Sequence, residues 1–340
     1  MKQHTFLRVS LAFALVFGFT FVAHELRRTN SSTADFTERA INQDEVSIEV
    51  EILGGVSGST IAKLLYTAGV IQSSQSFYKL AIVDARASRI APGVHLLNVQ
   101  ISAQQALEQL LDPLRMPNLI RIFEGAWNSE IFALLVKNGF TKNEIAEAVS
   151  QVRLPPGFST LEGLLFPAQY SFGKDESAVN ALQSMVENFQ IKTKGLSLSG
   201  DPKLTAQQVL VVASIIQAEG DTKDFQKISR VIRNRLNIGM PLQMDSTVHY
   251  IKKVRGSVFL STQSTLLKSA YNTYRKYGLP PGPIGNPGLD AIKASVNPAN
   301  GDWLFFITVS PGDTRFTSDI SEFNQWKALY TKNRKAGAFK

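Results

Sequence analysis

One carboxyl group, that of Glu219, follows a long apolar run and is placed to act as an acid or a base. Thr205 and Gln208 match a capping box, which predicts the start of a helix. Glu219 falls in the last turn of this helix, just before Gly220. Apolar residues cover much of the helix, namely Val209, Leu210, Val212, Ala213, Ile215 and Ile216.

A carboxyl group in that position is expected to hold its proton. The negative end of the helix dipole and the apolar surroundings both favour the neutral form of Glu219 and raise its pKa. A carboxyl group that is protonated near neutral pH can donate a proton to the oxygen of a glycosidic bond. The alternative interpretation is an exposed glutamate on a frayed helix end.

Three later segments, residues 239–250, 271–274 and 278–288, supply polar or aromatic side chains that suit a sugar. In residues 239–250 polar and apolar residues alternate, which predicts an extended segment lining a cleft. Residues 278–288 are so rich in Pro and Gly that they predict a rigid loop, either a binding loop or a purely structural one. The candidate substrate-binding residues are Gln243, Asp245, Ser246, Thr247, Tyr271, Asn272, Thr273 and Tyr274.

A second carboxyl group, that of Glu162, stands among apolar residues in the segment 161–170. These neighbours indicate a carboxyl group that lies against packed apolar side chains. A buried carboxylate needs hydrogen-bond donors or positive charges around it. We therefore include Glu162 among the candidate substrate-binding residues, with a structural hydrogen-bonding role as the alternative.

These candidates belong to a large C-terminal domain, predicted over residues 117–340, with mixed helices and strands. The pattern predicts a strand at 119–123, helices at 128–137, 143–152 and 227–236, a short helix at 290–295, a buried strand at 303–309 with a hairpin partner at 314–316, and a last helix at 321–333. The fold class is therefore α+β.

A smaller domain is predicted over residues 46–113. A strand begins at Val46, a helix capped by Ser59 and a second helix at 76–82 follow, and a strand at 94–99 leads to a helix capped by Ser102. This βααβ pattern resembles a LysM-like module, a small sugar-binding unit of wall-active proteins. A spacer without a ligand is the alternative, since fold alone does not establish function.

The N-terminus predicts a membrane anchor. Residues 9–26 are mostly apolar, and the uncharged stretch within them is short for a full span of about 20 residues. A cleaved signal peptide is the alternative, but no convincing cleavage site precedes the polar region. We predict a cytoplasmic tail at 1–8, a single transmembrane anchor at 9–26 and a flexible linker at 27–45.

Composition limits the chemistry further. The formal net charge of +8 indicates an acidic partner or an anionic surface. The basic residues are dispersed, without the clusters of a nucleic-acid groove, so no nucleic-acid partner is predicted. The chain has no Cys and four scattered His, which predicts no metal site and no thiol chemistry, and no cofactor is expected.

Several strings together resemble the YceG/MltG family of endolytic murein transglycosylases. These strings are residues 213–220, 234–236, 239–248 and 271–274, supported by 161–167 and the loop 278–288. The resemblance covers nearly the whole chain. Gln217 departs from the pattern, because many relatives carry a second Glu there, and Ala168-Gln169 replaces a frequent Asp-Thr.

The resemblance implies a function. Glu219 would protonate the bridging oxygen between N-acetylmuramic acid and N-acetylglucosamine and then accept the proton of the C6 hydroxyl, leaving a 1,6-anhydro end. Such an enzyme would cut nascent peptidoglycan strands outside the cell membrane and end their elongation, near cell-wall synthesis enzymes as possible partners.

Two other functions stay open at this stage. A lysozyme-like hydrolase would need a second carboxylate, and Asp245 and Glu162 are candidates. A non-catalytic wall-binding scaffold would use the LysM-like domain and the basic charge. A Ser-His-Asp hydrolase is disfavoured, because His249 is too close in sequence to Asp245 and Ser246 and no nucleophile elbow is found.

Overall fold

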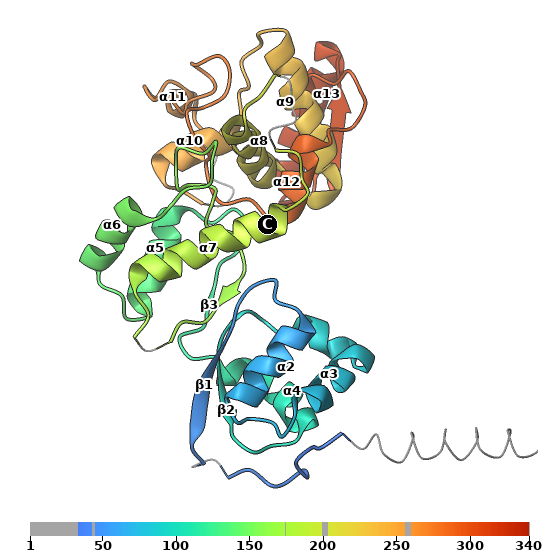
Figure 1. Ribbon diagram of the computed structural model, residues 1–340. Coiled ribbons are helices and arrows are strands. Elements are labelled where there is room, and N and C mark those ends of the chain that lie inside the picture. The colour runs from blue at the N-terminus through green and yellow to red at the C-terminus, as the bar shows by residue number, and fades with distance from the viewer. Residues whose placement is uncertain (1–32, 43–44, 174, 199–202, 256–259, 340) are drawn as a thin grey trace, which may run out of the picture. The chain divides into compact units, whose positions relative to one another are not determined.

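The computed structural model describes residues 33–42, 45–173, 175–198, 203–255 and 260–339 (Figure 1). The chain divides into two compact units, with the boundary between Pro117 and Asn118. Both units combine helices and strands, so the α+β class is confirmed. We refer to them as unit 1 and unit 2.

Unit 1 is built on an antiparallel strand pair, β1 with β2, that runs in register from Ser47 opposite Asn98 to Ile52 opposite Gly93. Its elements are β1 (Ser47–Ile52), α2 (Gly58–Thr67), α3 (Ser74–Val83), η1 (Ala85–Arg89), β2 (Gly93–Asn98), α4 (Ala103–Leu111) and η2 (Pro113–Arg115). This is the order that the sequence predicts. The resemblance to a LysM-like module stays a prediction.

Local capping explains where the helices of unit 1 begin. The first helix is capped by Ser57, whose side chain accepts a hydrogen bond from the Thr60 backbone, so the prediction that Ser59 caps it is wrong. Ser102 caps α4 as predicted and forms a full capping box with Gln105. Fully buried Leu65, Phe77 and Leu107 help to close the core between the strands and the helices.

Unit 2 is mainly helical, with two short antiparallel strand pairs, β3 with β4 and β5 with β6. Its elements are β3 (Ile120–Arg121), α5 (Asn128–Lys137), α6 (Lys142–Gln151), β4 (Gln169–Tyr170), α7 (Ala178–Thr193), α8 (Ala206–Glu219), η3 (Thr222–Asp224), α9 (Phe225–Asn237), α10 (Asp245–Lys252), α11 (Thr262–Thr265), α12 (Leu289–Val296), β5 (Phe305–Ser310), β6 (Asp313–Thr317) and α13 (Ile320–Lys335).

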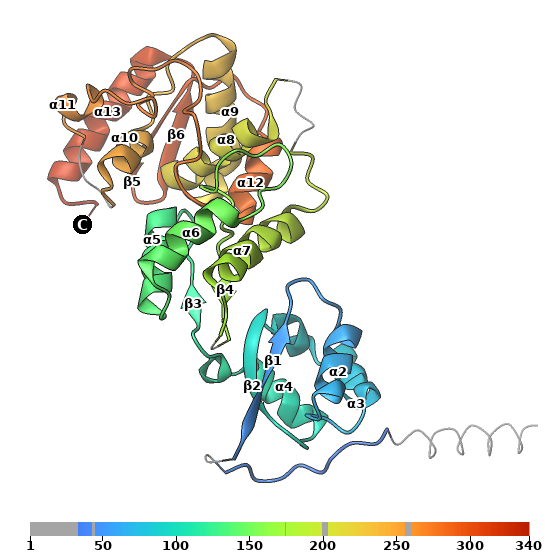
Figure 2. The ribbon, with the colours of Figure 1, turned by 60° about the vertical axis from the view of Figure 1, so that its left-hand side comes forward.

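Helix α8 is central to unit 2. Its residues from Val209 to Ile216 are all buried, as the apolar run predicts, and it packs against α9, α10 and α12. At the far end of the chain, α13 covers one side of the β5–β6 hairpin (Figure 2). The packing around α8 fixes the direction of its last turn, where Glu219 lies.

Three local predictions for unit 2 differ from the structure. Residues 245–252 form helix α10, whereas an extended segment is predicted there. Ser246, Thr247 and Val248 are all buried, and three consecutive buried residues do not follow the alternating exposure of a half-buried strand. The strand predicted as buried at 303–309 is β5, which is half-buried except at Val309. The long helix α7 is not predicted at all.

The predicted membrane anchor at 9–26 and the tail before it lie outside the described residues. Within the part that the structure describes, no helix combines the length and the apolar character needed to cross a membrane.

Candidate active site

Glu219 is the last residue of α8, and its neighbours fix its direction. Helix α8 begins with the predicted capping box between Thr205 and Gln208. Gly220 then turns the chain toward α9, and it has no room for a side chain, because a Cβ there would lie 2.4 Å from Cδ1 of Ile228. The absence of a side chain at Gly220 therefore allows the tight approach between the end of α8 and α9.

The Glu219 carboxyl group meets the beginning of a second helix, α10. The backbone N–H of Ser246 donates a hydrogen bond of 3.0 Å to Oε1 of Glu219. Helix α10 has no side-chain cap of its own, since Met244 precedes it. Glu219 thus takes the place of the missing cap and satisfies one of the free N–H groups at the start of α10.

Two helix ends act on this carboxyl group in opposite directions. The C-terminal end of α8 favours the neutral acid, and the N-terminal end of α10 favours the carboxylate. Burial is the largest effect and raises the pKa of Glu219, while Ser246 and His249 lower it and the charge of Asp245 raises it. The Ser246 hydroxyl lies close enough to favour the carboxylate, although it makes no hydrogen bond of good geometry with a described residue.

Glu219 as a whole residue is partly exposed, at the end of α8. Asp245 and Tyr274 flank the same carboxyl group. The Tyr274 hydroxyl donates a hydrogen bond to Oδ1 of Asp245, and burial raises the pKa of Tyr274 well above its usual value. Arg235 is buried behind them and donates hydrogen bonds to the carbonyl oxygens of Leu304 and Leu242.

Three of the predicted binding residues are fully or almost fully buried and hold the site together. Asn272 donates hydrogen bonds to the carbonyl oxygens of Thr265 and Leu267 and accepts one from the Tyr274 backbone. Thr273 accepts from the Met244 backbone, and its hydroxyl bonds to that of Thr247. In this conformation Asn272, Thr273 and Thr247 lie 0%, 1% and 0% exposed, out of reach of a sugar.

The remaining predicted binding residues divide by exposure. Gln243 and Asp245 are exposed, and Tyr271 and Tyr274 are partly exposed. Gln243 adopts a positive φ of 49°, a conformation that is uncommon for a residue other than Gly, and its backbone N–H bonds to the Thr273 carbonyl oxygen. Ser246 is buried and contributes its backbone N–H.

Glu162 is held at both oxygens. The Asn128 backbone N–H donates to Oε1 and the Tyr250 hydroxyl donates to Oε2, each at 3.0 Å. Burial raises the pKa of Glu162, and these two donors and the Lys253 charge lower it. Its carboxyl group caps the start of α5, where Trp127 offers no side-chain cap.

Two aromatic residues that the sequence analysis did not select, Trp127 and Tyr250, lie with Tyr271 beside Glu162. The Tyr250 ring lies 5.9 Å from that of Trp127 and 5.2 Å from that of Tyr271, between ring centroids. The Lys253 ammonium lies 3.7 Å above the Tyr250 ring, a cation–π contact. A helical interpretation of residues 245–252 would have found Tyr250, because it lies one turn after Ser246 on the same face.

The Pro/Gly-rich loop is fixed by two side chains. Asn286 is fully buried, donates to Ala126 and Asn128 and accepts from the Leu165 backbone. Gln217 accepts a hydrogen bond of 2.9 Å from the Gly288 backbone at the start of α12. The residue that departs from the family pattern, Gln217, therefore ties the loop to α8.

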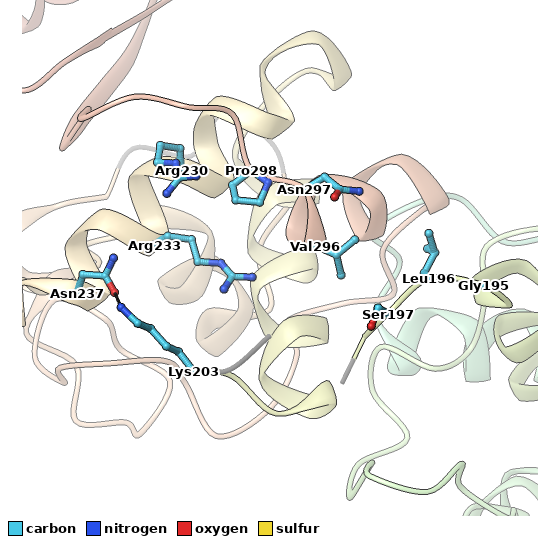
Figure 3. A pocket seen from close by; sticks show the side chains of 10 residues that line it. All are labelled: Gly195, Leu196, Ser197, Lys203, Arg230, Arg233, Asn237, Val296, Asn297 and Pro298. Atoms are coloured by element: carbon cyan, nitrogen blue, oxygen red, sulfur yellow. Dashed lines mark hydrogen bonds between the residues drawn. The ribbon is translucent and has the colours of Figure 1, made fainter. Parts of the chain in front are cut away.

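The pocket that unit 2 forms beside α9 does not coincide with Glu219. It has a volume of about 630 Å³ and lies between α9 and the end of α12, and its lining includes none of the residues around Glu219 (Figure 3). No group of three or more metal-ligating side chains occurs among the described residues. The candidate active site is therefore the surroundings of the Glu219 carboxyl group, whose hydrogen bond and raised pKa suit acid–base chemistry.

Comparison with known sequences gives one family and several relatives. The sequence model of the YceG-like family matches residues 50–328. A protein of Bacillus subtilis (strain 168) named endolytic murein transglycosylase is 29% identical over 318 residues, which cover 86% of this chain and 87% of that protein. A protein of Streptococcus pneumoniae (strain ATCC BAA-255 / R6) with the same name is 37% identical over 184 residues, 51% of this chain and 33% of that protein.

A solved structure is similar as well. The crystal structure of the yceG-like protein lmo1499 from Listeria monocytogenes superimposes with a TM-score of 0.54 at 26% sequence identity. The similarity covers 82% of this chain and 98% of that chain.

Proposed function

This chain belongs to the YceG-like family, and on that premise we propose that it is an endolytic murein transglycosylase that cuts peptidoglycan glycan strands. Relatives named for this activity align with most of the chain in one case and with half of it in another. The observation that carries the proposal is the Glu219 carboxyl group, which lies at the end of a buried helix, has a pKa raised by burial and is bound by a backbone N–H.

In the proposed reaction Glu219 acts first as an acid and then as a base. Its proton goes to the oxygen that joins C1 of N-acetylmuramic acid to N-acetylglucosamine, and the C1–O bond breaks. The C6 hydroxyl oxygen of the same muramic acid then bonds to C1 and gives its proton to Glu219. The product is a 1,6-anhydro ring, no water is consumed, and Glu219 returns to its protonated form.

The two opposed helix ends suit these two steps. The neutral acid of the first step is favoured by burial and by the end of α8. The carboxylate left after proton donation accepts the Ser246 N–H at the start of α10, which stabilises the charge until the second step. One carboxyl group can therefore perform both proton transfers.

We assign the predicted binding residues two kinds of role. Gln243, Asp245, Tyr271 and Tyr274 are at least partly exposed and are proposed to contact the sugars. The buried group instead positions the exposed residues through the hydrogen bonds described above, and it comprises Ser246, Thr247, Asn272 and Thr273. Glu162 is proposed to position Tyr250 and the start of α5.

Hydrolysis by a second carboxylate is the competing function. Both oxygens of Glu162 accept hydrogen bonds, which hold its carboxyl group against Asn128 and Tyr250. Asp245 accepts a hydrogen bond from the Tyr274 hydroxyl. These contacts favour the transglycosylase over a lysozyme-like hydrolase.

Mass spectrometry of digested glycan strands tests the proposal. The full chain should produce anhydro ends, whereas a hydrolase would produce reducing ends and a wall-binding scaffold would cleave nothing. Glu219→Gln should abolish the anhydro product. The matched control is Glu147→Gln, which removes an exposed carboxylate on α6 and should leave cleavage unchanged.

The proposed location is the outer side of the cell membrane. We propose that residues 9–26 anchor the chain there, that residues 46–113 hold glycan as a LysM-like module, and that wall-synthesis enzymes are neighbours. The chain has no Cys, so a single Cys introduced by Ala338→Cys is a unique label. A membrane-impermeant maleimide should label it in intact cells, and labelling only after lysis would contradict the proposed orientation.

A further inference from the structure

Helix α10 ends at an exposed lysine with an uncommon backbone conformation. Lys253 is the C-cap residue of α10 and has a φ of 53°, in the left-handed region where Gly or Asn is usual at a helix end. A lysine in this conformation is strained relative to a glycine. Its side chain is therefore a candidate for a function that a glycine could not perform.

Two aromatic rings hold the Lys253 ammonium group. It lies 3.7 Å from the centroid of the Tyr250 ring and 5.1 Å from that of the Trp127 ring, and both are cation–π contacts. Within the part of the chain that the structure describes, this ammonium group makes no hydrogen bond and no ion pair. An ammonium group has three N–H donors, so those of Lys253 are open to a ligand with oxygen acceptors.

The charged side chains around Lys253 are bound to other partners. Glu130 accepts two hydrogen bonds from Arg255, of 3.0 and 2.5 Å, and both oxygens of Glu162 accept hydrogen bonds as described above. Burial lowers the pKa of Lys253 the most, and the charge of Arg255 lowers it further. The charges of Glu162 and Glu130 raise it. A carboxylate that binds to Lys253 would raise this pKa again and stabilise the charged ammonium group.

Helix α10 also fixes the distance from Lys253 to the proposed catalytic acid. Ser246, which binds Glu219, and Lys253 are seven residues apart, or about 10 Å along a helix that rises 1.5 Å per residue. Tyr250 lies between them on α10, and its ring is 5.2 Å from that of Tyr271, a residue that is proposed to contact sugar. A glycan strand bound along this side of α10 therefore presents to Lys253 a group that is remote from the bond cleaved at Glu219.

We propose that Lys253, held over Tyr250 and Trp127, binds a carboxylate of the glycan strand. This inference rests on the proposed function, because it concerns the substrate of the same site. The carboxylates of peptidoglycan lie on its peptide stems and, where a stem has been removed, on the lactyl group of the muramic acid. A cation with open N–H donors matches such a group, since a hydrogen bond between two charged partners is stronger than a neutral one. Lys253 therefore acts in substrate binding and not in proton transfer.

Cleavage kinetics of the full chain with four kinds of glycan strand test the proposal. Strands with stems and strands freed of their stems by an amidase are each used as such and after their carboxylates have been neutralised with methylamine and a carbodiimide. Lys253→Met keeps an apolar side chain over the rings and removes the charge. It should raise KM about tenfold on strands that carry the recognised carboxylate and leave kcat unchanged, because the contact is remote from the reacting bond. On neutralised strands its KM should equal that of the unmodified chain.

The outcomes separate the two sources of the carboxylate. An increase of KM that is lost when the stems are removed identifies a stem carboxylate, and an increase on amidase-treated strands identifies the lactyl carboxylate. An equal increase on neutralised strands, or no increase on any strand, overturns the proposal. Should Lys253→Met fail to fold, the unmodified chain still decides, because neutralising the strands should raise its own KM about tenfold.

Two further variants control for charge. Lys253→Arg keeps a cation over the rings and should have a KM within twofold of that of the unmodified chain. Lys137→Met removes an exposed charge on α5 and should leave KM unchanged on every strand. If Lys137→Met raises KM as much as Lys253→Met does, general attraction between the basic chain and the strands explains the effect and the proposal is overturned.

Strand binding separates this proposal from the proposed function. A Glu219→Gln chain, which should not cleave, should cosediment more strongly with carboxylate-bearing strands than with neutralised ones, and adding Lys253→Met should remove that preference. The preference without any cleavage by the unmodified chain would overturn the proposed function alone. Cleavage without the preference would overturn the role of Lys253 alone.

Discussion

The surroundings of Glu219 and of Glu162 form a natural comparison within unit 2. Burial raises the pKa of both carboxyl groups. Glu162 accepts a hydrogen bond at each oxygen and lies close to the Lys253 charge, whereas Glu219 accepts one backbone hydrogen bond, from Ser246. Hydrogen bonds thus fix both oxygens of Glu162 to neighbouring elements, whereas the one hydrogen bond described for Glu219 involves only its Oε1.

Helix α10 links the two carboxyl groups. Ser246, near its start, binds Glu219, and Tyr250, one turn later, binds Glu162. Glu219 therefore caps the start of α10, and one turn later the same helix places Tyr250 against Glu162. A change at Glu162 should reach Glu219 only through a shift of α10.

The largest expected effect comes from Glu219→Gln. Cleavage should fall roughly 1,000-fold, because a carboxamide cannot donate and accept the proton. The amide oxygen can still accept the Ser246 N–H, so the fold should persist. Anhydro ends are counted by mass spectrometry and folding is followed by thermal unfolding. Substantial residual cleavage in a folded Glu219→Gln chain would remove the distinction between the two carboxyl groups.

Glu162→Ala should act on stability first. It leaves the Asn128 N–H and the Tyr250 hydroxyl without their acceptor, which should lower the free energy of unfolding by about 2 kcal/mol. Glu162→Gln keeps one acceptor oxygen and should cost less. Urea unfolding measures both variants.

The product that these two variants form sharpens the comparison. Any cleavage that remains should still give anhydro ends, since Glu162 does not take part in the reaction. If Glu162→Gln stops cleavage as completely as Glu219→Gln does and stays folded, Glu162 is a second reacting carboxyl group and the hydrolase is favoured.

Tyr274→Phe should have a smaller effect. It removes the hydrogen bond to Asp245 beside Glu219, and kcat/KM should fall roughly tenfold. Tyr277→Phe is the matched control, because Tyr277 is 73% exposed and should lose nothing measurable. Equal rates for both variants would show that the Asp245–Tyr274 pair does not support the reaction.

The sequence predicts the α8 side of the site and misses the α10 side. The capping box, the apolar run and the position of Glu219 in the last turn are local patterns, and the structure has each of them. The hydrogen bond from Ser246 joins residues 27 positions apart, so no local pattern contains it. The opposing effect of α10 on the pKa of Glu219 is missed for the same reason.

The missed elements have related causes. Helix α7 mixes buried residues such as Phe189 with polar ones such as the buried Asn188, which weakens its helical pattern. Alternation in residues 239–250 imitates a strand, although tertiary contacts of Thr247 and Val248 make the second half a helix. The side chain of an Asn can bind a sugar or the protein backbone equally well. Only the burial of Asn286 in the structure shows that it binds backbone groups.

The smallest expected effect is a pH dependence of stability. A carboxyl group whose pKa is raised by folding stabilises the protein fully below its unfolded value, near 4.5, and that contribution is lost as the pH rises through the folded pKa. Gln does not titrate. The stability of Glu219→Gln relative to the unmodified chain should therefore increase from pH 4 toward neutral pH, and that of Glu162→Gln should follow the same direction.

Urea unfolding at a series of pH values measures this difference. His95 in unit 1 is buried with a lowered pKa, but it titrates alike in every variant and cancels. Glu147→Gln should show no increase. If the stability difference between Glu219→Gln and the unmodified chain does not change with pH, Ser246 and the start of α10 hold Glu219 as a carboxylate. Glu219 could then not protonate the glycosidic oxygen, and Glu162 would be the only carboxyl group of the pair with a raised pKa.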